Sequence, residues 1–236
     1  MQPESLAEIA ADVARETGAL LRAMFATDLS VRSKGPADVV SEADHAAQEL
    51  IERRLLEARP DDGLLGEEDL ARTGSTGLRW VIDPLDGTAN YLHGVPVWCV
   101  SIGCEDGDGP LAGAVYDACR DELFTAARGR GLRVDGEPLH RPARAPSLAE
   151  AMVCGSLGRI LDRVGHPRDF GSAAIELAWT AAGRCDAFHH GAPQEWDVSA
   201  GTILCREAGL EVSRAQGVTA GPAGLVEELL ALLRSR

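Results

Sequence analysis

Basic residues are scarce in this sequence relative to acidic ones. The 236 residues include 23 lysines and arginines against 37 aspartates and glutamates, so the formal net charge is −14. A chain with this excess of negative charge is repelled by nucleic-acid backbones and by anionic membrane surfaces. We therefore expect neither a nucleic acid nor a membrane as a partner. A small anionic substrate is compatible with the composition if bound cations neutralise the acidic site around it.

Long apolar runs, targeting signals and paired cysteine motifs are also missing. No stretch approaches the roughly 20 apolar residues of a membrane span. The N-terminal segment MQPESLAEIAADVARE has no basic region followed by an apolar one, as a secretory signal would. The six cysteines include no C-x-x-C pair. These absences predict a cytoplasmic protein with reduced thiols.

Hydrophobic periodicity predicts two N-terminal helices followed by a sheet. Apolar residues recur at three- and four-residue steps from Leu6 to Met24, and a second apolar face follows Ser41, the expected N-cap of a helix that ends near Pro60. From residue 79 the pattern changes to short β-rich segments separated by glycine, proline and aspartate. Strands are expected at 79–83, 97–105, 111–118, 122–127 and 131–136. Their short connections predict mostly antiparallel pairing.

Strands and helices alternate beyond about residue 148. We expect strands at 151–156, 185–190 and 210–213, and helices at 172–182, 197–208 and 223–233. A helix pair, an antiparallel sheet and an alternating part together predict a layered α/β sandwich. The boundary is expected near residue 145. Residues 1–145 would form an N-terminal lobe, and residues 146–236 a C-terminal α/β lobe that completes a shared cleft.

The strongest chemical signal is the segment 80–88, WVIDPLDGT. A strand leads into Asp83 and Asp86, with Pro84 expected to end the ladder pairing and Gly87 to permit a tight turn. Two carboxylates about 4 Å apart repel by roughly 4 kcal/mol at an effective dielectric constant of 20. Such a pair must share a proton, separate or hold a cation, and its oxygen ligands select Mg²⁺, Mn²⁺ or Ca²⁺. A turn and helix cap without chemistry is the alternative.

Two further acidic segments are ambiguous when taken alone. The run Glu67-Glu68-Asp69 follows Gly66 and is typical of a solvated loop. In the segment 195–201, EWDVSAG, Asp197 is expected to cap a helix whose small residues permit close packing. Each segment by itself therefore favours a purely structural interpretation.

The combination of these segments changes that interpretation. GEE at 66–68, DPLDGT at 83–88 and WDVSAG at 196–201 together resemble the inositol monophosphatase family of metal-dependent phosphatases. Weaker similarity covers Lys34, Asp38, Asp44 and the stretch 168–186. The resemblance implies the layered α-β-α-β-α sandwich of that family. It also implies Mg²⁺-dependent, lithium-sensitive hydrolysis of myo-inositol 1-phosphate or a related small sugar phosphate, and a homodimer.

The resemblance assigns roles to individual residues. Two or three Mg²⁺ ions, with Mn²⁺ as an alternative, would be bound by Glu67, Asp83, the Leu85 carbonyl, Asp86 and Asp197. Glu67 and Thr88, with Asp44 behind Thr88, would position the attacking water. The substrate would contact Asp86, Gly87, Thr88, Gly171, Ser172, Ala173, His190 and Asp197. His190 stands where many relatives that hydrolyse inositol phosphates have a glutamate, so the alcohol side of the site is expected to differ.

Other substrates and another class of function remain open. The same chemistry serves histidinol phosphate, fructose 1,6-bisphosphate or 3′-phosphoadenosine 5′-phosphate. Aromatic residues make up only 4% of the chain, which disfavours a nucleotide substrate that needs a stacking platform. A regulatory or interaction protein with vestigial activity is the alternative of another class. The complete set of acidic residues favours an enzyme.

Overall fold

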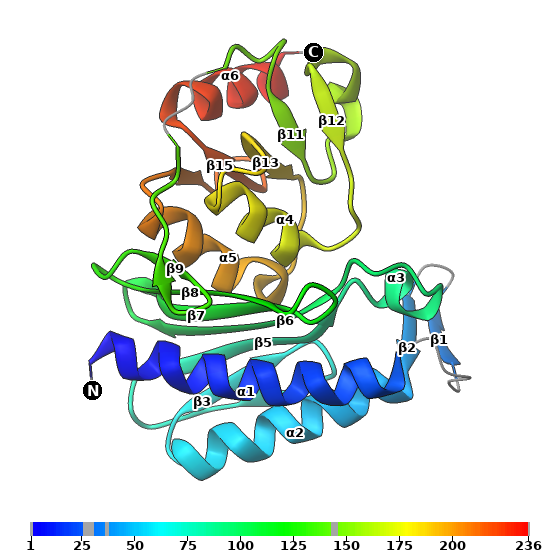
Figure 1. Cartoon of the computed structure of the whole chain (residues 1–236), viewed down its shortest axis with the longest axis vertical. Helices are drawn as coiled ribbons and strands as arrows, with labels where there is room; N and C mark the ends of the chain where they lie inside the picture. Colours follow the sequence, from blue (N-terminus) through cyan, green and yellow to red (C-terminus); the bar gives the residue numbers. More distant parts are fainter. Residues whose placement is uncertain (1, 26–30, 36–37, 143–145, 236) are drawn as a thin grey trace.

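The computed structural model arranges the chain in five layers, which Figure 1 shows from α1 and α2 at one end to α6 at the other. It describes residues 2–25, 31–35, 38–142 and 146–235, and for 31–35 and 38–41 only the backbone. An eight-stranded sheet lies between the pair α1 and α2 and the pair α4 and α5. A five-stranded sheet separates α4 and α5 from α6. This is the predicted α-β-α-β-α sandwich.

The helices are α1 (Pro3–Met24), α2 (Glu42–Ala58), α3 (Thr88–Leu92), α4 (Ala173–Ala181), α5 (Glu195–Glu207), α6 (Ala223–Arg234) and the 3₁₀-helix η1 (Gly158–Arg163). A separate two-stranded sheet consists of β1 (Val31–Gly35) and β2 (Asp38–Ser41). All helices expected from the sequence are present near their predicted bounds. The side chains of Lys34, Asp38 and Ser41, including the predicted cap, lie outside the described residues.

The eight-stranded sheet has the order β10-β9-β8-β7-β6-β5-β3-β4. Its strands are β3 (Gly63–Gly66), β4 (Ala71–Arg72), β5 (Arg79–Asp86), β6 (Cys99–Asp106), β7 (Gly109–Asp117), β8 (Glu122–Ala127), β9 (Leu132–Val134) and β10 (Glu137–Pro138). Strands β5 to β9 match the predicted antiparallel series. Strand β3 was not predicted, and it pairs with β5 in parallel. This parallel pair contributes directly to the candidate site.

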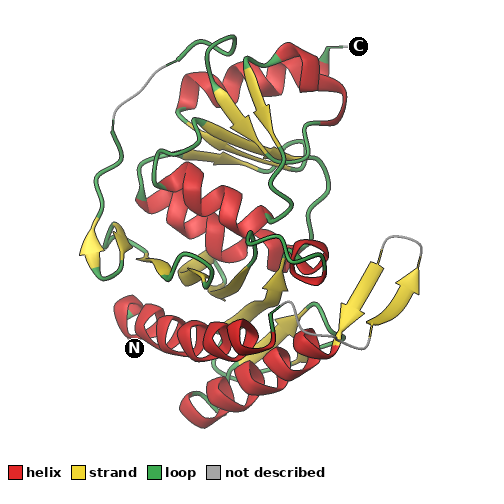
Figure 2. Ribbon diagram, turned by 45° about the vertical axis from the view of Figure 1, so that its right-hand side comes forward, coloured by secondary structure: helices red, strands yellow, loops and turns green. Residues whose placement is uncertain are grey.

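The five-stranded sheet has the order β12-β11-β13-β15-β14. Its strands are β11 (Met152–Cys154), β12 (His166–Arg168), β13 (Ala187–His190), β14 (Glu211–Ser213) and β15 (Val218–Gly221). β11 pairs in parallel with β12 and β13, whereas β15 pairs antiparallel with β13 and β14. Figure 2 shows α4 and α5 packed between this sheet and the larger one.

Alternating side chains of β6 and β7 build two separate cores. Val100, Ile102 and Cys104 of β6 face α1 and α2, whereas Cys99 faces α4 and α5. Side chains of a strand point alternately to its two faces, so one strand contributes to both layers. Cys99 and Cys104 are buried in these two cores, and none of the six described cysteines forms a disulfide, in line with the reduced thiols expected from the sequence.

Glycine allows α5 to approach the sheet closely. A Cβ atom built on Gly103 would lie 2.4 Å from Ser199 Oγ, and one built on Gly113 would lie 3.0 Å from Ala200 Cα. Larger residues at either position would force the helix away from the sheet. Within the described ranges, no helix has the length and apolar character needed to cross a membrane. The lobe boundary near residue 145 stays a prediction.

Candidate active site

The ends of β3 and β5 bring the first two acidic segments together. Gly66 of β3 pairs with Ile82 of β5 in parallel register. The residues that follow, Glu67 and Asp83, therefore lie at the same edge of the sheet. Asp83 is 2% exposed, and its Oδ1 accepts the Leu85 N–H at 3.1 Å. Glu67 is thus half-buried at the sheet edge that carries Asp83, and not part of a fully solvated loop.

Strand β5 continues past Pro84, contrary to our expectation that the proline would end it. The ladder with β6 is irregular between Asp83 and Asp86 and then resumes, with Asp86 opposite Cys99. An irregularity accommodates proline because the missing N–H is not needed there. It also brings Asp86 back into the sheet, next to the layer of α4.

The turn after Asp86 has the predicted form. Gly87 has φ of +99°, and a Cβ there would lie 2.9 Å from the Val97 carbonyl oxygen, so the turn requires glycine. Thr88 starts α3, and its Oγ lies 2.9 Å from the Leu85 carbonyl and 3.3 Å from Asp44 Oδ1. The structure therefore brings the predicted pair Asp44 and Thr88 into contact.

Asp197 lies one turn into α5 and is not the residue that caps it. The helix begins at Glu195, with Gln194 as N-cap and Asp197 at the third helical position. The Gln194 N–H donates to Asp197 Oδ2 at 2.8 Å, forming one half of a capping box. Our expectation of a cap was wrong in position because the helix starts two residues earlier. The carboxylate still stabilises the helix start.

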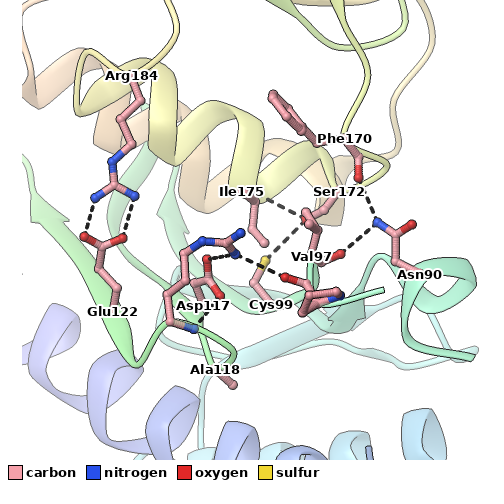
Figure 3. Close-up of polar contacts among 12 residues, drawn as sticks. Asn90, Val97, Cys99, Asp117, Ala118, Glu122, Phe170, Ser172, Ile175 and Arg184 are labelled. Carbon is pink, nitrogen blue, oxygen red and sulfur yellow. Dashed lines mark hydrogen bonds and ion pairs between the residues drawn. The ribbon is translucent and has the colours of Figure 1, made fainter. Parts of the chain in front are cut away.

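The N-terminus of α4 holds Asp86 in place. Asp86 Oδ2 accepts the Ser172 hydroxyl at 2.7 Å and the Ala174 N–H at 2.6 Å. Ser172 also accepts the Ile175 N–H, as the N-cap of α4. Cys99 Sγ lies 3.7 Å from Ser172 Oγ, and Figure 3 shows the two side chains pointing toward each other. Ser172 therefore supports a carboxylate as well as lining the cavity predicted for it.

Asn90 fixes the loop before α4 through two hydrogen bonds. Its Nδ2 donates to the Val97 carbonyl at 2.8 Å and to the Phe170 carbonyl at 2.7 Å, as Figure 3 shows. The Phe170 N–H in turn donates to Glu176 Oε1 at 2.5 Å. These contacts tie α3, directly after the DGT turn, to the segment that delivers Ser172 to Asp86. We did not predict the roles of Asn90 and Glu176.

A second set of contacts ties α5 to the strand that carries Asp83. Ser199 Oγ donates to Glu105 Oε1 at 2.7 Å, and Arg79 Nη2 donates to Glu105 Oε2 at 2.9 Å. Arg79 Nη2 also donates to Glu195 Oε2 at 2.6 Å. Glu105 therefore joins β5 and β6 to the first turns of α5. We call these hydrogen bonds among Arg79, Glu105, Glu195 and Ser199 the Glu105 clamp. They hold the start of α5, where Asp197 lies, beside the carboxylates of β5.

The clustered carboxyl groups disfavour one another's ionisation. Burial, followed by the charges of other acids, raises the pKa of Glu67 to about 7 and that of Asp83 well above its usual range. Burial also raises the pKa of Asp86 to about 7, against the opposing hydrogen bond from Ser172. The pKa of Asp197 is raised mainly by burial. The strongest charges acting on Asp83 come from Asp86, Glu67, Asp197 and Asp44, all carboxylates.

This donor set suits hard divalent cations. Within the described residues, no three histidine, cysteine, aspartate or glutamate side chains already form a group able to hold an ion. The acids are nevertheless all oxygen donors, and their mutual repulsion is the electrostatic condition that a bound cation relieves. The residues therefore fit the predicted cation.

A cavity of about 300 Å³ opens beside Asp86 and Asp197. Its lining residues are Asp86, Ser156, Asp169, Gly171, Ser172, Ala173, Glu176, His190 and Asp197. His190 lies in it as predicted, with Nδ1 accepting the Ala192 N–H at 3.3 Å. The neighbouring His189 is buried on the other face of β13 against Thr219. Ser156, Asp169 and Glu176 were not predicted. The isolated acid in the otherwise apolar segment AAIELAWTA was the available signal for Glu176.

Comparison with known proteins now decides the family. The family model described as "Inositol monophosphatase family" matches residues 2–232. The chain belongs to this family. As a member of the inositol monophosphatase family it is a phosphoric monoester hydrolase, which confirms the predicted enzyme class.

Individual relatives agree with this assignment. The chain is 40% identical to the inositol-1-monophosphatase of Mesorhizobium japonicum, over 80% of this chain and 77% of that protein. It is 33% identical to the inositol-1-monophosphatase SuhB of Mycobacterium tuberculosis, over 99% of this chain and 94% of that one. The crystal structure of the extragenic suppressor protein SuhB from Bartonella henselae superposes with a TM-score of 0.91 at 34% identity, covering 98% and 99% of the two chains. This structural similarity confirms the predicted fold.

Proposed function

We propose that this inositol monophosphatase family member hydrolyses myo-inositol 1-phosphate, or a closely related small polyol phosphate, with Mg²⁺ as cofactor. The supporting observation is the convergence of Glu67, Asp83, Asp86 and Asp197 from three separate segments, with Asp86 and Asp197 lining a cavity of about 300 Å³. Relatives named inositol-1-monophosphatase support the choice of ester. The family as a whole supports the choice of cation.

Mg²⁺ would be held by the carboxylates of Glu67, Asp83, Asp86 and Asp197 and by the Leu85 carbonyl. When bound, it would polarise the phosphate oxygens and lower the pKa of a water molecule. The Thr88 hydroxyl donates within the protein, so its lone pairs are available to accept a hydrogen bond from the attacking water. Asp44 is buried and fixes the orientation of that hydroxyl. Glu67, whose pKa is about 7, would orient the same water.

The leaving alcohol would occupy the cavity beside α4 and β13. Gly171, Ser172, Ala173 and His190 line this side of the site, as the resemblance implied. Backbone N–H groups of Gly87 and Thr88 would contact the phosphate. The Nδ1 atom of His190 is occupied by the Ala192 N–H, so its Nε2 carries the proton and can donate to a substrate hydroxyl. A homodimer, a cytoplasmic location, lithium inhibition and use of Mn²⁺ remain our predictions.

A panel of phosphate esters tests the proposed substrate. Phosphate release would be measured from myo-inositol 1-phosphate, histidinol phosphate, fructose 1,6-bisphosphate and 3′-phosphoadenosine 5′-phosphate, each with Mg²⁺, with chelator and with added lithium. We expect Mg²⁺-dependent release that is fastest from the inositol ester and is inhibited by lithium. Faster release from another ester would change the substrate. Mg²⁺ binding without release from any ester would favour the regulatory alternative.

Removal of the clamp at Glu105 is expected to weaken Mg²⁺ binding. Glu105→Ala removes the acceptor for Ser199 and one of the two acceptors for Arg79, so the start of α5 keeps the Arg79–Glu195 pair but loses its link to β6, and Asp197 is held less firmly. Loss of such supporting contacts typically lowers metal affinity by about 10- to 100-fold. The Mg²⁺ concentration for half-maximal phosphate release should rise by at least about tenfold, with little change in KM at saturating Mg²⁺.

The next residue along β6 provides a matched control for Glu105. Asp106 lies on the same strand as Glu105 and forms an ion pair with Arg128 at 2.9 Å. No hydrogen bond described for Asp106 reaches α5. Asp106→Ala should therefore leave the Mg²⁺ requirement unchanged. Equal shifts in both variants, or no shift in Glu105→Ala, would show that the clamp does not position Asp197.

A further inference from the structure

The alcohol side of the cavity has an unusual charge balance for an enzyme that binds an anionic substrate. Of its nine lining residues, four carry carboxyl groups and none is lysine or arginine. Asp86 and Asp197 belong to the proposed cation site. Asp169 and Glu176 lie outside it, so bound Mg²⁺ would not use their carboxyl groups. We call these two residues the acidic wall.

Glu176 is fixed in the wall by its surroundings. Its side chain comes from the first turn of α4 and is 2% exposed. Oε1 accepts the Phe170 N–H, and Phe170 is itself held by Asn90. For Oε2 the structure shows no hydrogen-bond partner within the described residues, although the residue lines the cavity. A carboxyl oxygen of a cavity-lining residue that has no protein partner is available to a ligand.

Asp169 supplies the negative charge of the wall. It is exposed, and its Oδ1 accepts the Gly171 N–H at 3.1 Å, which turns the carboxylate toward the loop that lines the cavity. Burial raises the pKa of Glu176 to about 8, and the Asp169 charge adds to that rise. The two groups are therefore close enough to interact. Glu176 thus offers a protonated carboxyl group near neutral pH, beside the exposed carboxylate of Asp169.

We infer that the acidic wall selects phosphomonoesters whose alcohol part is neutral or cationic and excludes esters with a second phosphate. This inference rests on the proposed function of the cavity. A second phosphate would approach Asp169 without a basic residue of the lining to pair with it, so repulsion and loss of hydration both oppose binding. Polyol hydroxyls can donate to both carboxyl groups, and an ammonium group is attracted to Asp169.

The acidic wall would distinguish among the four candidate phosphate esters that the sequence analysis did not resolve. Fructose 1,6-bisphosphate and 3′-phosphoadenosine 5′-phosphate both carry a second phosphate and are disfavoured. Myo-inositol 1-phosphate has a neutral alcohol, and histidinol phosphate has a cationic one, so both are accepted. The selection concerns the charge of the alcohol part and is independent of how the scissile phosphate is held.

Three esters of graded charge test the wall. The values of kcat/KM would be compared for histidinol phosphate, myo-inositol 1-phosphate and myo-inositol 1,4-bisphosphate. For the native enzyme we expect the bisphosphate to be at least about tenfold poorer than the inositol monophosphate. Asp169→Asn keeps an oxygen for the Gly171 N–H and removes the charge. It should raise the bisphosphate value about fivefold, lower the histidinol phosphate value by a similar factor and leave the neutral ester within about twofold.

Two further variants complete the design. Adding Glu176→Gln to Asp169→Asn keeps the acceptor for Phe170 and, because Glu176 is already neutral near pH 7, should leave the bisphosphate value within about twofold of that of Asp169→Asn alone. Asp162→Asn, an exposed acid of η1 that does not line the cavity, should leave the order of the three esters unchanged. Added salt should reduce the discrimination shown by the native enzyme because it screens the Asp169 charge.

The possible outcomes distinguish a failure of charge selection by the acidic wall from a failure of the proposed function. A uniform change on all three esters in Asp169→Asn would indicate a structural defect and overturn the inference. Equal native rates on the monophosphate and bisphosphate would also overturn it, while the proposed function would stand. Without hydrolysis of any ester the proposed function fails. Calorimetric binding of the same three esters must then show the same order for the wall to be retained.

Discussion

Asp86→Asn is expected to lower phosphate release from myo-inositol 1-phosphate by at least about 100-fold while leaving the fold intact. The hydrogen bonds from Ser172, Ala174 and the Cys99 thiol to this side chain all go to the same oxygen, Oδ2. The amide oxygen of asparagine can occupy that position and accept them. The amide NH₂ group then replaces Oδ1, so a donor without charge stands where the cation needs an acceptor.

The thermal stability of the metal-free variant is expected to equal or exceed that of the native chain. Burial raises the pKa of Asp86 to about 7, so the ionised native side chain opposes folding at pH 8. Asparagine removes that penalty. Thermal unfolding and initial rates on the same samples test both statements. Native turnover in the variant would show that Asp86 does not bind the cation.

Asp117→Asn is the matched control for this prediction. Asp117 is also fully buried, but it pairs with Arg120 at 2.9 Å and does not line the cavity. Burial raises the pKa of Asp117 as it does that of Asp86, but asparagine also loses the ion pair with Arg120, so the two effects on the unfolding temperature oppose each other and the net change should be small. Activity per folded molecule should remain close to native. The two substitutions are thus expected to differ chiefly in activity.

The metal-free protein is expected to lose stability as the pH rises from 5 to 8. The folded-state pKa values of Glu67 and Asp86 are each raised to about 7, so the folded protein retains protons that the unfolded chain releases near pH 4. Unfolding then releases protons, and the free energy of unfolding falls with pH until the folded groups have also ionised. One group shifted in this way contributes on the order of 3 kcal/mol, or roughly 6–12 °C in unfolding temperature.

Mg²⁺ should abolish most of this pH dependence. A cation bound to the ionised acids removes the repulsion between them and stabilises the folded state by mass action. Thermal unfolding would be followed across pH 5 to 8 with chelator and with excess Mg²⁺. We expect a falling unfolding temperature with chelator and a much flatter profile with Mg²⁺. A metal-free unfolding temperature that rises through this range would contradict the clustering of the acids.

Periodicity and spacing predicted most of the elements that carry the site. The apolar steps from Leu6 to Met24 and the β-rich segments after residue 79 mark α1 and β5 to β8 near their observed bounds. The DPLDGT segment predicted the turn at Gly87, because only glycine suits its positive φ. Local signals of this kind are sufficient wherever the structure depends on neighbouring residues.

Contacts between distant segments could not be predicted from local patterns. Strand β3 is only four residues long with glycine at both ends, and its pairing with β5 depends on the whole sheet. The support of Asp86 by Ser172 joins residues 86 positions apart, and that of Ser199 by Glu105 joins residues 94 apart. The resemblance to a family identified the acids but not the contacts that position them.

The dependence of phosphate release on Mg²⁺ tests the central claim most directly. The native chain, freed of metal by chelation and dialysis, would be titrated with Mg²⁺ at a saturating concentration of myo-inositol 1-phosphate. We expect no measurable release without Mg²⁺, a saturable recovery on its addition, and no recovery in Asp86→Asn over the same range. Release at an undiminished rate in the presence of chelator would contradict the account of these carboxylates as a catalytic cation site.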